Sequence, residues 1–427
     1  MSTAAMAAPS HVQDLGIRRS VLEDLALKIF YLQGELSLGE LSEQMHVNLG
    51  VADELFQRLR KEQLVEVTGM TGAVHRVTTS SQGKSRAMEL LAINGYAGPA
   101  PVSFGDYVGH VRAQTIQDLK VGPDDVKKAF QHLVLEPQML TRLGTALTSG
   151  RAIFLYGSTG TGKTTIAEAL TRLLSREDVW IPYAIELDGQ IITIFDPHVH
   201  RVSEESLPQG HDHRWVLCRR PRVLVGGELT VEMLDLQFNA NTRFYTAPVQ
   251  MKANNGLLIV DDFGRQRIRA SELLNRWVVP LDRHIDFMTL VGGKKVEVPF
   301  DLFVVFATNM DPGKLVDEAF LRRIQTKIKV DFVTPQQFHQ IFRNVCAEFN
   351  LEYSEPVVEH AMSVIRNDMR QPLRACYPRD LARQIVWAAK FLSEEPVLDA
   401  ESVVRACRNY FLEPTGEEAE KVSHFTQ

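Results

Sequence analysis

Apolar residues in the first hundred positions follow two different spacings. They recur every three or four positions over 21–30, 38–45 and 50–63, which predicts three helices, each with one buried face. Over 64–68 and 74–78 they alternate with polar residues on either side of a Gly-Met-Thr-Gly turn, which predicts a β-hairpin. The amino-terminal part of the chain is therefore expected to combine α-helices with a small antiparallel sheet.

This order of elements, closed by a further helix expected over 81–91, resembles a winged helix. Residues 20–95 are therefore expected to form a separate winged-helix-like α+β domain. A winged helix suggests DNA binding, but 20–95 contain seven basic and ten acidic residues, a net charge of −3, and the third helix mixes both signs. A helix that enters the major groove is expected to be basic. DNA contact is therefore kept as an alternative, and a protein-contacting or packing role is favoured.

The hydrophobic pattern is interrupted on both sides of this domain. Residues 1–19 are expected to be a disordered tail, and 96–122, which contain a Gly-Pro-Ala-Pro run, are expected to be a linker. A second domain is expected from position 123, where helices over 123–130 and 137–148 lead to an apolar strand. The last residues, 413–427, are expected to be a tail.

The apolar strand 152–156 leads directly into a complete phosphate-binding motif. Residues 157–164 read Gly-Ser-Thr-Gly-Thr-Gly-Lys-Thr and match G-x-x-x-x-G-K-[ST] in full. The three glycines let the backbone curl and aim N–H groups at phosphate oxygens. Lys163 places a positive charge on the terminal phosphates, the Thr164 hydroxyl can ligate Mg²⁺, and the following helix turns its positive end toward the same anion. The residues expected to bind a nucleoside triphosphate are Gly157, Ser158, Thr159, Gly160, Thr161, Gly162, Lys163, Thr164 and Thr165.

Two further apolar segments end in polar residues. The first, 256–260, is followed by Asp261 and Asp262, and the second, 302–308, is followed by Asn309. An acid at the carboxyl end of a buried parallel strand lies near the phosphate loop, so Asp261 is expected to hold Mg²⁺ through its water shell. Asp262 is expected to orient or deprotonate the attacking water, and Asn309 to contact the γ-phosphate or position that water.

Together with the sequence Glu-Ala-Phe-Leu-Arg-Arg-Ile at 318–324, these segments resemble the AAA+ ATPase family over about 118–412. The resemblance implies an α/β P-loop NTPase fold with a parallel sheet of AAA+ type over 123–333, a carboxy-terminal α-helical lid over 334–412, and ATP with Mg²⁺ as cofactors. Four amphipathic lid helices are expected, over 335–349, 356–369, 378–392 and 400–412. Family roles that the resemblance implies are sensor 1 for Asn309, sensor 2 for Arg379, and an arginine finger for Arg322 or Arg323 that completes the site of a neighbouring subunit.

Two insertions narrow the resemblance to one group within the AAA+ family. Alternating segments over 285–290 and 294–298, around Gly-Gly, resemble a pre-sensor-1 hairpin. The long stretch 180–255, with alternating 234–238 and 243–246, resembles the helix-2 insert of MoxR-like ATPases and magnesium chelatase subunits. In such rings these hairpins line the pore or face the client. The resemblance therefore implies a homo-oligomeric ring, a hexamer, that hydrolyses ATP to remodel a protein client.

The acidic pair departs from the family pattern, in which Asp is followed by Glu. The shorter side chain of Asp262 sets its carboxylate back by about one carbon–carbon bond, which weakens its hold on the attacking water. Hydrolysis is still favoured. A slow or non-hydrolysing nucleotide switch stays open as an alternative, as does a DNA-associated loader or regulator that uses the winged helix.

Composition limits the other function classes. With 427 residues, 44% of them hydrophobic and 23% charged, the chain is expected to form two or three globular domains. The net charge of −6 gives no sign of a nucleic-acid or anionic-membrane partner. No apolar run is long enough to span a bilayer, and the four cysteines are scattered, so a reduced, cytoplasmic protein without membrane insertion is expected.

Two His-x-His pairs, His198 with His200 and His211 with His213, lie near Cys218. This spacing can bind Zn²⁺ when both imidazoles lie on one side of a strand. No second cysteine or acid completes a ligand set, so the histidines are interpreted as polar loop residues.

Overall fold

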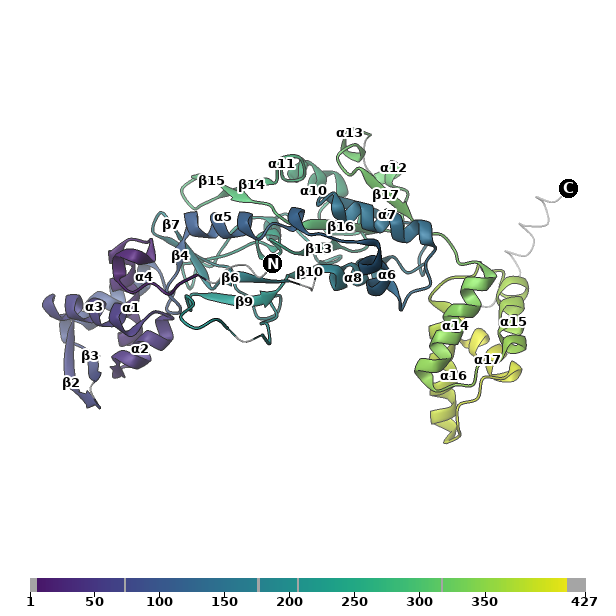
Figure 1. Ribbon diagram of the computed structural model, residues 1–427, viewed down its shortest axis with the longest axis horizontal. Coiled ribbons are helices and arrows are strands. Elements are labelled where there is room, and N and C mark those ends of the chain that lie inside the picture. Colours follow the sequence, from purple (N-terminus) through teal and green to yellow (C-terminus); the bar gives the residue numbers. More distant parts are fainter. Residues whose placement is uncertain (1–5, 73, 175–176, 206, 316–317, 413–427) are drawn as a thin grey trace.

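The computed structural model describes residues 6–72, 74–174, 177–205, 207–315 and 318–412. Figure 1 shows an elongated molecule with a small amino-terminal domain at one end, a central α/β layer structure, and a helical lid at the other end. Within the described ranges, none of the helices has the length and apolarity needed to cross a membrane.

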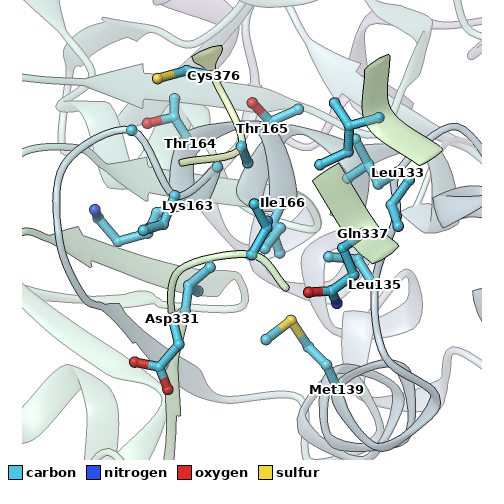
Figure 2. Close-up of a pocket in the computed structure, with 18 of the residues that line it drawn as sticks. Leu133, Leu135, Met139, Lys163, Thr164, Thr165, Ile166, Asp331, Gln337 and Cys376 are labelled. Atoms are coloured by element: carbon cyan, nitrogen blue, oxygen red, sulfur yellow. The ribbon is translucent and has the colours of Figure 1, made fainter. Parts of the chain in front are cut away.

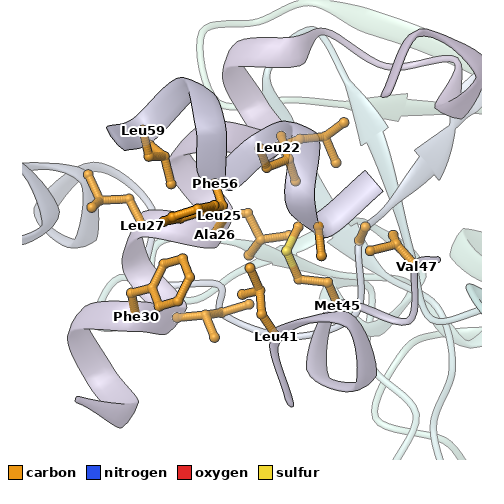
Figure 3. Close-up of a cluster of buried hydrophobic side chains, with 14 of the residues drawn as sticks. Leu22, Leu25, Ala26, Leu27, Phe30, Leu41, Met45, Val47, Phe56 and Leu59 are labelled. Carbon is orange, nitrogen blue, oxygen red and sulfur yellow. The ribbon is translucent and has the colours of Figure 1, made fainter. Parts of the chain in front are cut away.

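The amino-terminal domain packs four helices against a three-stranded antiparallel sheet of order β1-β3-β2. Its second helix begins at a capping box, in which Ser37 and Glu40 satisfy each other's backbone N–H groups. Leu25, Phe30 and Phe56 lie at the centre of its core (Figure 3). The helices and the hairpin expected from the sequence are therefore present. The elements are α1 (Arg19–Gln33), β1 (Leu36–Ser37), α2 (Leu38–Met45), α3 (Leu49–Lys61), β2 (Val65–Thr71), β3 (Val74–Thr79) and α4 (Ser81–Ile93).

The disordered tail expected over 1–19 is wrong for residues 6–19, and residues 1–5 lie outside the part of the chain that the structure describes. A 3₁₀ turn, η1 (Val12–Leu15), buries both of its terminal apolar side chains in the core of the amino-terminal domain. Ala7 forms an antiparallel bridge with His211, and the Pro9 carbonyl accepts a hydrogen bond from Asn48. Two buried side chains in one turn are too few to produce a periodic pattern, so this packing could not be predicted from the sequence.

The linker expected over 96–122 is likewise an ordered part of the fold. It contains β4 (Val102–Ser103), α5 (Phe104–Ala113) and η2 (Ile116–Asp118), and the side chains of Tyr107 and Val111 are buried. Helix α5 packs against the insert strands and the hairpin of the central unit. The Gly-Pro-Ala-Pro run marks a turn into this packed segment.

The central sheet is parallel throughout, with the order β10-β13-β16-β5-β17. Residues of β5 alternate between two cores. Ile153 and Leu155 pack against α6, α7 and α8, whereas Ala152 and Phe154 pack with α10 and α11. This two-sided burial and the loop after β5 make the fold an α/β P-loop NTPase. The elements are α6 (Pro123–Phe130), α7 (Pro137–Thr148), β5 (Ala152–Tyr156), α8 (Lys163–Leu174), β10 (Arg222–Val225), β13 (Leu257–Val260), α10 (Ala270–Arg276), α11 (Val278–Arg283), β16 (Phe303–Thr308), α12 (Pro312–Leu315), α13 (Glu318–Leu321) and β17 (Thr326–Lys329).

The long insert between α8 and β13 supplies four strands of a second sheet, of order β11-β12-β8-β7-β4, and a two-stranded ribbon of β6 and β9. The remaining strand of the sheet, β4, comes from the segment before α5 and pairs with β7. The expected hairpin is present as β14 paired with β15. The expected strands of the insert are also present, although β11 and β12 are only two residues long. The elements are β6 (Asp178–Pro182), β7 (Ala184–Leu187), β8 (Gln190–Thr193), β9 (Trp215–Arg219), η3 (Glu232–Leu234), β11 (Gln237–Phe238), β12 (Tyr245–Thr246), α9 (Val249–Lys252), β14 (Ile285–Thr289) and β15 (Lys295–Pro299).

The amino-terminal domain is fixed to this insert by buried polar contacts. Arg214 pairs with Asp212 at 2.7 Å and donates to the carbonyls of Leu15 and Pro101 at 3.0 and 3.1 Å. The turn between β11 and β12 touches the end of α4, where Gly95 N–H donates to the Thr242 carbonyl at 2.8 Å. The amino-terminal domain and the insert therefore share one continuous packed region.

The lid is a helical unit with its own core, centred on side chains such as Phe338, Phe342 and Leu381. The four helices expected from the sequence are present, and the second ends in a π-helical turn. The elements are α14 (Pro335–Phe349), α15 (Glu355–Ser363), η4 (Val364–Asp368), α16 (Tyr377–Leu392) and α17 (Ala400–Tyr410).

Candidate nucleotide-binding site

A hollow of about 1190 Å³ lies between the carboxyl edge of the parallel sheet, the loop 131–136 and the lid. Figure 2 shows its two sides, with Lys163 and Asp331 on one and the apolar side chains of Leu133, Leu135 and Met139 on the other. This division suits a ligand with a charged end and a flat apolar end.

The phosphate loop begins with a glycine that no other residue can replace. Gly157 has φ +141°, and a Cβ there would lie 2.2 Å from the Val330 carbonyl oxygen, because β17 passes directly beside the loop. Gly160 and Gly162 also have positive φ, at 76° and 97°. The three glycines predicted to permit this curl therefore all adopt backbone angles that favour glycine.

Lys163 is the first residue of α8, and its ammonium group lies inside the loop. It donates to the carbonyls of Gly157 and Ser158 at 2.9 and 2.8 Å. Burial lowers the pKa of Lys163, whereas the negative charges of Asp261 and Asp262 act to raise it. A phosphate in the loop would supply the countercharge that this partly desolvated ammonium group favours.

Thr164 and Asp261 meet as expected. The Thr164 hydroxyl donates to both carboxylate oxygens of Asp261, at 3.2 and 3.0 Å. Asp261 is itself held in place, because its N–H donates to the Val225 carbonyl and its own carbonyl accepts from Gln266 at 2.7 Å. Hydroxyl and carboxylate oxygens are the ligands that Mg²⁺ prefers, so this pair fits that ion.

Asn309 lies at the end of β16, which stands between β5 and β13 in the sheet. Its side-chain amide donates to the Thr159 hydroxyl at 3.3 Å. The strand order thus places Asn309 between the phosphate loop and the acids.

Asp262 follows Asp261 with φ +47°, in the left-handed region, and its side chain is exposed to the hollow. Asp and Asn tolerate this region better than longer residues do. Its N–H donates to the Asp261 carboxylate at 3.0 Å. One acid is therefore bound to Thr164 and the other faces the open hollow.

The lid reaches the same hollow through two contacts that the sequence did not indicate. Arg379 forms a bidentate pair with Glu348 of α14, at 2.9 and 2.7 Å. Cys376 N–H donates to the Gly160 carbonyl at 3.2 Å, so the lid touches the phosphate loop itself. Neither Glu348 nor Cys376 stands in a recognisable motif. The packing of α14 on α16 brings Glu348 to Arg379, and the packing of the lid on the loop brings Cys376 to Gly160.

Arg322 and Arg323 do not reach this hollow. They line a separate hollow of about 330 Å³ with Arg151, Asp282 and Gln325. Arg151 and Gln325 immediately precede β5 and β17, so this second hollow lies at the amino edge of the sheet. The phosphate loop lies at the carboxyl edge, a strand length away.

The four histidines lie in loops and turns outside the helices and strands, as expected from the sequence, but two of them also pack in the interior. His200 and His211 are buried, whereas His198 and His213 are exposed. Across the described ranges, no cluster of three or more His, Cys, Asp or Glu side chains is placed to hold a metal. His200 instead bridges backbone groups, and Cys218 is buried in the core of the insert.

Comparisons with known proteins give distant likenesses. A family model described as a domain of unknown function (DUF8689) matches residues 334–409, within the lid. A search of the curated proteins found no match to the sequence.

Among solved structures, the chain is similar to RuvB of Thermotoga maritima, described as a Holliday junction branch migration motor. The identity is 14%, the TM-score is 0.35, and 69% of this chain and 72% of that chain are covered. It is also similar to the FIGL-1 AAA domain, with 11% identity, 75% and 93% coverage and a TM-score of 0.35. A third similar structure is NtrX from Brucella abortus, with 11% identity, coverage of 82% of this chain and 61% of that chain, and a TM-score of 0.38. These likenesses are too distant to carry an argument, and the fold is assigned from the chain's own strand order.

Proposed function

We propose that this protein is a MoxR-like ATPase of the AAA+ class that binds ATP with Mg²⁺ between its sheet and its lid. The observation that carries the proposal is the convergence of three pairs at one edge of the sheet. Lys163 fills the phosphate loop, Thr164 donates to Asp261, and Asn309 donates to Thr159. The apolar side of the hollow would receive the base.

In the proposed reaction each residue has a separate task. Lys163 exchanges its two loop carbonyls for phosphate oxygens and neutralises their charge. Thr164 and Asp261 would hold Mg²⁺, which supplies electrostatic stabilisation of the phosphates. Asp262 orients the attacking water and accepts its proton, and Asn309 fixes the position of that water. Arg379, now paired with Glu348, would turn to the γ-phosphate when the lid closes.

We also propose that the protein is a homo-oligomer, and the position of the two arginines supports this. Arg322 and Arg323 lie at the amino edge of the sheet, so neither can act on the nucleotide of its own subunit. In a head-to-tail ring, which we propose to be a hexamer, this edge faces the nucleotide of the next subunit. The client is proposed to be a protein that contacts the insert and the β14–β15 hairpin. A cytoplasmic location, favoured by four unpaired cysteines, is part of the same proposal.

A DNA-associated role is less well supported. The helix expected to read DNA, α3, is partly covered by the chain's own amino-terminal segment. Glu54 of α3 accepts a hydrogen bond from Val12 N–H and pairs with His11 at 2.6 Å. A helix tied in this way presents a blocked, partly acidic surface to a DNA groove. A slow nucleotide switch stays the second candidate, because the exposed carboxylate of Asp262 is one carbon shorter than Glu.

Single-turnover hydrolysis and nucleotide binding test the proposal. Lys163→Ala should abolish ATP binding, whereas Asp262→Asn should bind ATP and lower the hydrolysis rate by about 100-fold or more. Glu35→Ala, which removes a surface ion pair in the amino-terminal domain, is the control. An Asp262→Asn rate equal to that of the unmodified protein would remove Asp262 from the reaction. Undetectable hydrolysis by the unmodified protein, with ATP still bound, would favour the switch.

Assembly and DNA binding are separate measurements. Sedimentation with ATP and Mg²⁺ should show an oligomer, and a monomer at all protein concentrations would exclude a trans arginine. A salt-sensitive mobility shift of duplex DNA at low ionic strength would revive the DNA alternative.

A further inference from the structure

The two arginines at the amino edge of the sheet are held very differently. Arg323 Nε donates to Asp282 Oδ2 at 2.9 Å, and its side chain is 30% exposed. Arg322 is 77% exposed, and among the described residues its ion-pair contact, at 3.8 Å, is with Glu318, which is itself 87% exposed. A planar guanidinium held through Nε has its orientation fixed, whereas an exposed arginine on a long stem samples many rotamers.

Geometry excludes a role for either arginine in its own subunit's site. The strand that separates their hollow from the phosphate loop, β5, has five residues and spans roughly 16 Å. The hollow is also electrostatically suited to an anion, since Arg151, Arg322 and Arg323 line it with a single acid, Asp282.

We propose that Asp282 is a positioning residue that holds Arg323, rather than Arg322, in the orientation that reaches the nucleotide of the neighbouring subunit. This inference rests on the proposed function and assigns the arginine that the sequence left open. The pre-set guanidinium loses less conformational freedom when it meets the transferring phosphoryl group, so the gain appears in kcat.

The contact between Arg323 and Asp282 also links the proposed nucleotide site of the neighbouring subunit to the β14–β15 hairpin. Asp282 lies in the last turn of α11, and after the left-handed residue His284, with φ +59°, the chain enters β14 directly. The start of β14 is also tied to α10, because Arg276 pairs with buried Asp286. A displacement of Arg323 by the neighbour's nucleotide would therefore act on the helix that carries the β14–β15 hairpin.

Steady-state kinetics on the full-length oligomer is the first experiment. Arg323→Ala should lower kcat by about 1,000-fold or more, as loss of an arginine finger does, and Arg322→Ala should lower it much less. Asp282→Ala should lower kcat by about 10- to 100-fold with little change in KM, because Arg323 remains but loses the Nε contact that helps to orient it. In the double variant, kcat should be as low as in Arg323→Ala alone, because Asp282 acts through Arg323.

A matched control is available in the amino-terminal domain. Glu35 accepts from Arg76 Nε at the same distance, 2.9 Å, in a pair that is 36% and 45% exposed, against 30% and 44% for Arg323 and Asp282. Half-exposed ion pairs contribute little to stability, so neither Glu35→Ala nor Asp282→Ala should alter thermal unfolding. Only Asp282→Ala should alter kcat.

A subunit-mixing experiment separates positioning in trans from a structural effect. Lys163→Ala subunits cannot use their own site but carry an intact Asp282–Arg323 pair. When they are mixed in equal amounts with Asp282→Ala subunits, about a quarter of the interfaces in a head-to-tail ring combine an intact phosphate loop with an intact pair. The mixture should therefore be more active than either variant alone.

Three results would overturn the inference. One is an unchanged kcat for Asp282→Ala, another is a larger loss for Arg322→Ala than for Arg323→Ala, and the third is a mixture whose activity is the average of its components. Failure of the proposed function looks different, because the unmodified protein would then lack either hydrolysis or assembly.

Discussion

Protonation of one buried imidazole is predicted to loosen the insert at mildly acidic pH. His200 is 2% exposed and bridges two backbone groups. Its Nδ1 accepts from Asp196 N–H at 2.9 Å, and its Nε2 lies 2.8 Å from the Lys252 carbonyl, to which it must donate. Only the neutral ring with its proton on Nε2 satisfies both partners, since a second proton on Nδ1 would face the Asp196 N–H.

The size of the expected loss in the free energy of unfolding follows from the lowered pKa of His200. Burial lowers the pKa of His200 from 6.5 to about 4, and the neighbouring charges of Asp196 and Lys252 partly cancel each other. Above pH 6.5 the ring is neutral in the folded and the unfolded chain. Between pH 6.5 and 4 only the unfolded chain binds the proton, so the free energy of unfolding falls as the pH falls. The loss amounts to about 2 to 3 kcal/mol by pH 4.5 and grows little below pH 4.

Amide hydrogen exchange measures this loss locally, which matters because a chain of several domains does not unfold in two states. His200→Gln cannot titrate, and its amide can still donate to the Lys252 carbonyl. Comparing both proteins at the same pH cancels the intrinsic exchange rate. From pH 7.5 to 4.5, protection of the β6–β9 ribbon in the unmodified protein should fall by about 50- to 100-fold relative to the variant. His360→Gln, at an exposed histidine of the lid, should match the unmodified protein at both pH values.

The reasoning would be refuted if the ratio of ribbon protection in the unmodified protein to that in His200→Gln were the same at pH 7.5 and 4.5. Such a result would mean that His200 gains its proton equally well in the folded chain. If His200→Gln fails to fold, an NMR titration of the imidazole nitrogens gives the same answer. His200 should then stay neutral at pH 5, and protonation near pH 6.5 would contradict the prediction.

Two further predictions concern contacts between distant parts of the chain. Arg214→Leu leaves the buried carboxylate of Asp212 without its partner. It should destabilise the contact between the amino-terminal domain and the insert by about 3 to 5 kcal/mol and raise hydrogen exchange over residues 6–18. Unchanged exchange there would show that this contact does not depend on the Arg214–Asp212 pair. Gly160→Ala puts a Cβ 2.7 Å from Cys376 Sγ, so it should raise the nucleotide Kd by about 10-fold or more in a fluorescent-ATP titration. Adding Cys376→Ala should recover part of the affinity, and no recovery would assign the loss to backbone strain at Gly160 alone.

The sequence predicted the geometry of the candidate site where that geometry depends on a few consecutive backbone residues. Three glycines in a fixed order give the phosphate loop its positive φ angles, and the lysine and threonine that follow need no distant residue to be recognised. Asp261 and Asn309 were predictable for a related reason. Each follows an apolar run long enough to be a buried strand, and the carboxyl ends of parallel strands meet at one edge.

The expected linker and tail failed because their burial depends on single contacts rather than on a period. Val12 and Leu15 contribute two side chains to the core, and α5 packs against strands that are distant in sequence. A short segment of this kind carries no repeating pattern, so its hydrophobic residues look like those of an exposed loop.

The chain's own sequence thus determined that a phosphate-binding loop, paired acids and a polar strand end exist, because each is a property of a few consecutive residues. Only the tertiary structure decided which partners the other side chains around these features contact, and at which edge of the sheet they lie. It bound Arg379 to Glu348 at the hollow beside the phosphate loop, placed Arg323 beside Asp282 at the opposite edge of the sheet, and brought Cys376 against Gly160. These pairs join residues that lie between 31 and 216 positions apart in the sequence. The packing of the sheet and the lid brings them together, and no local sequence pattern does.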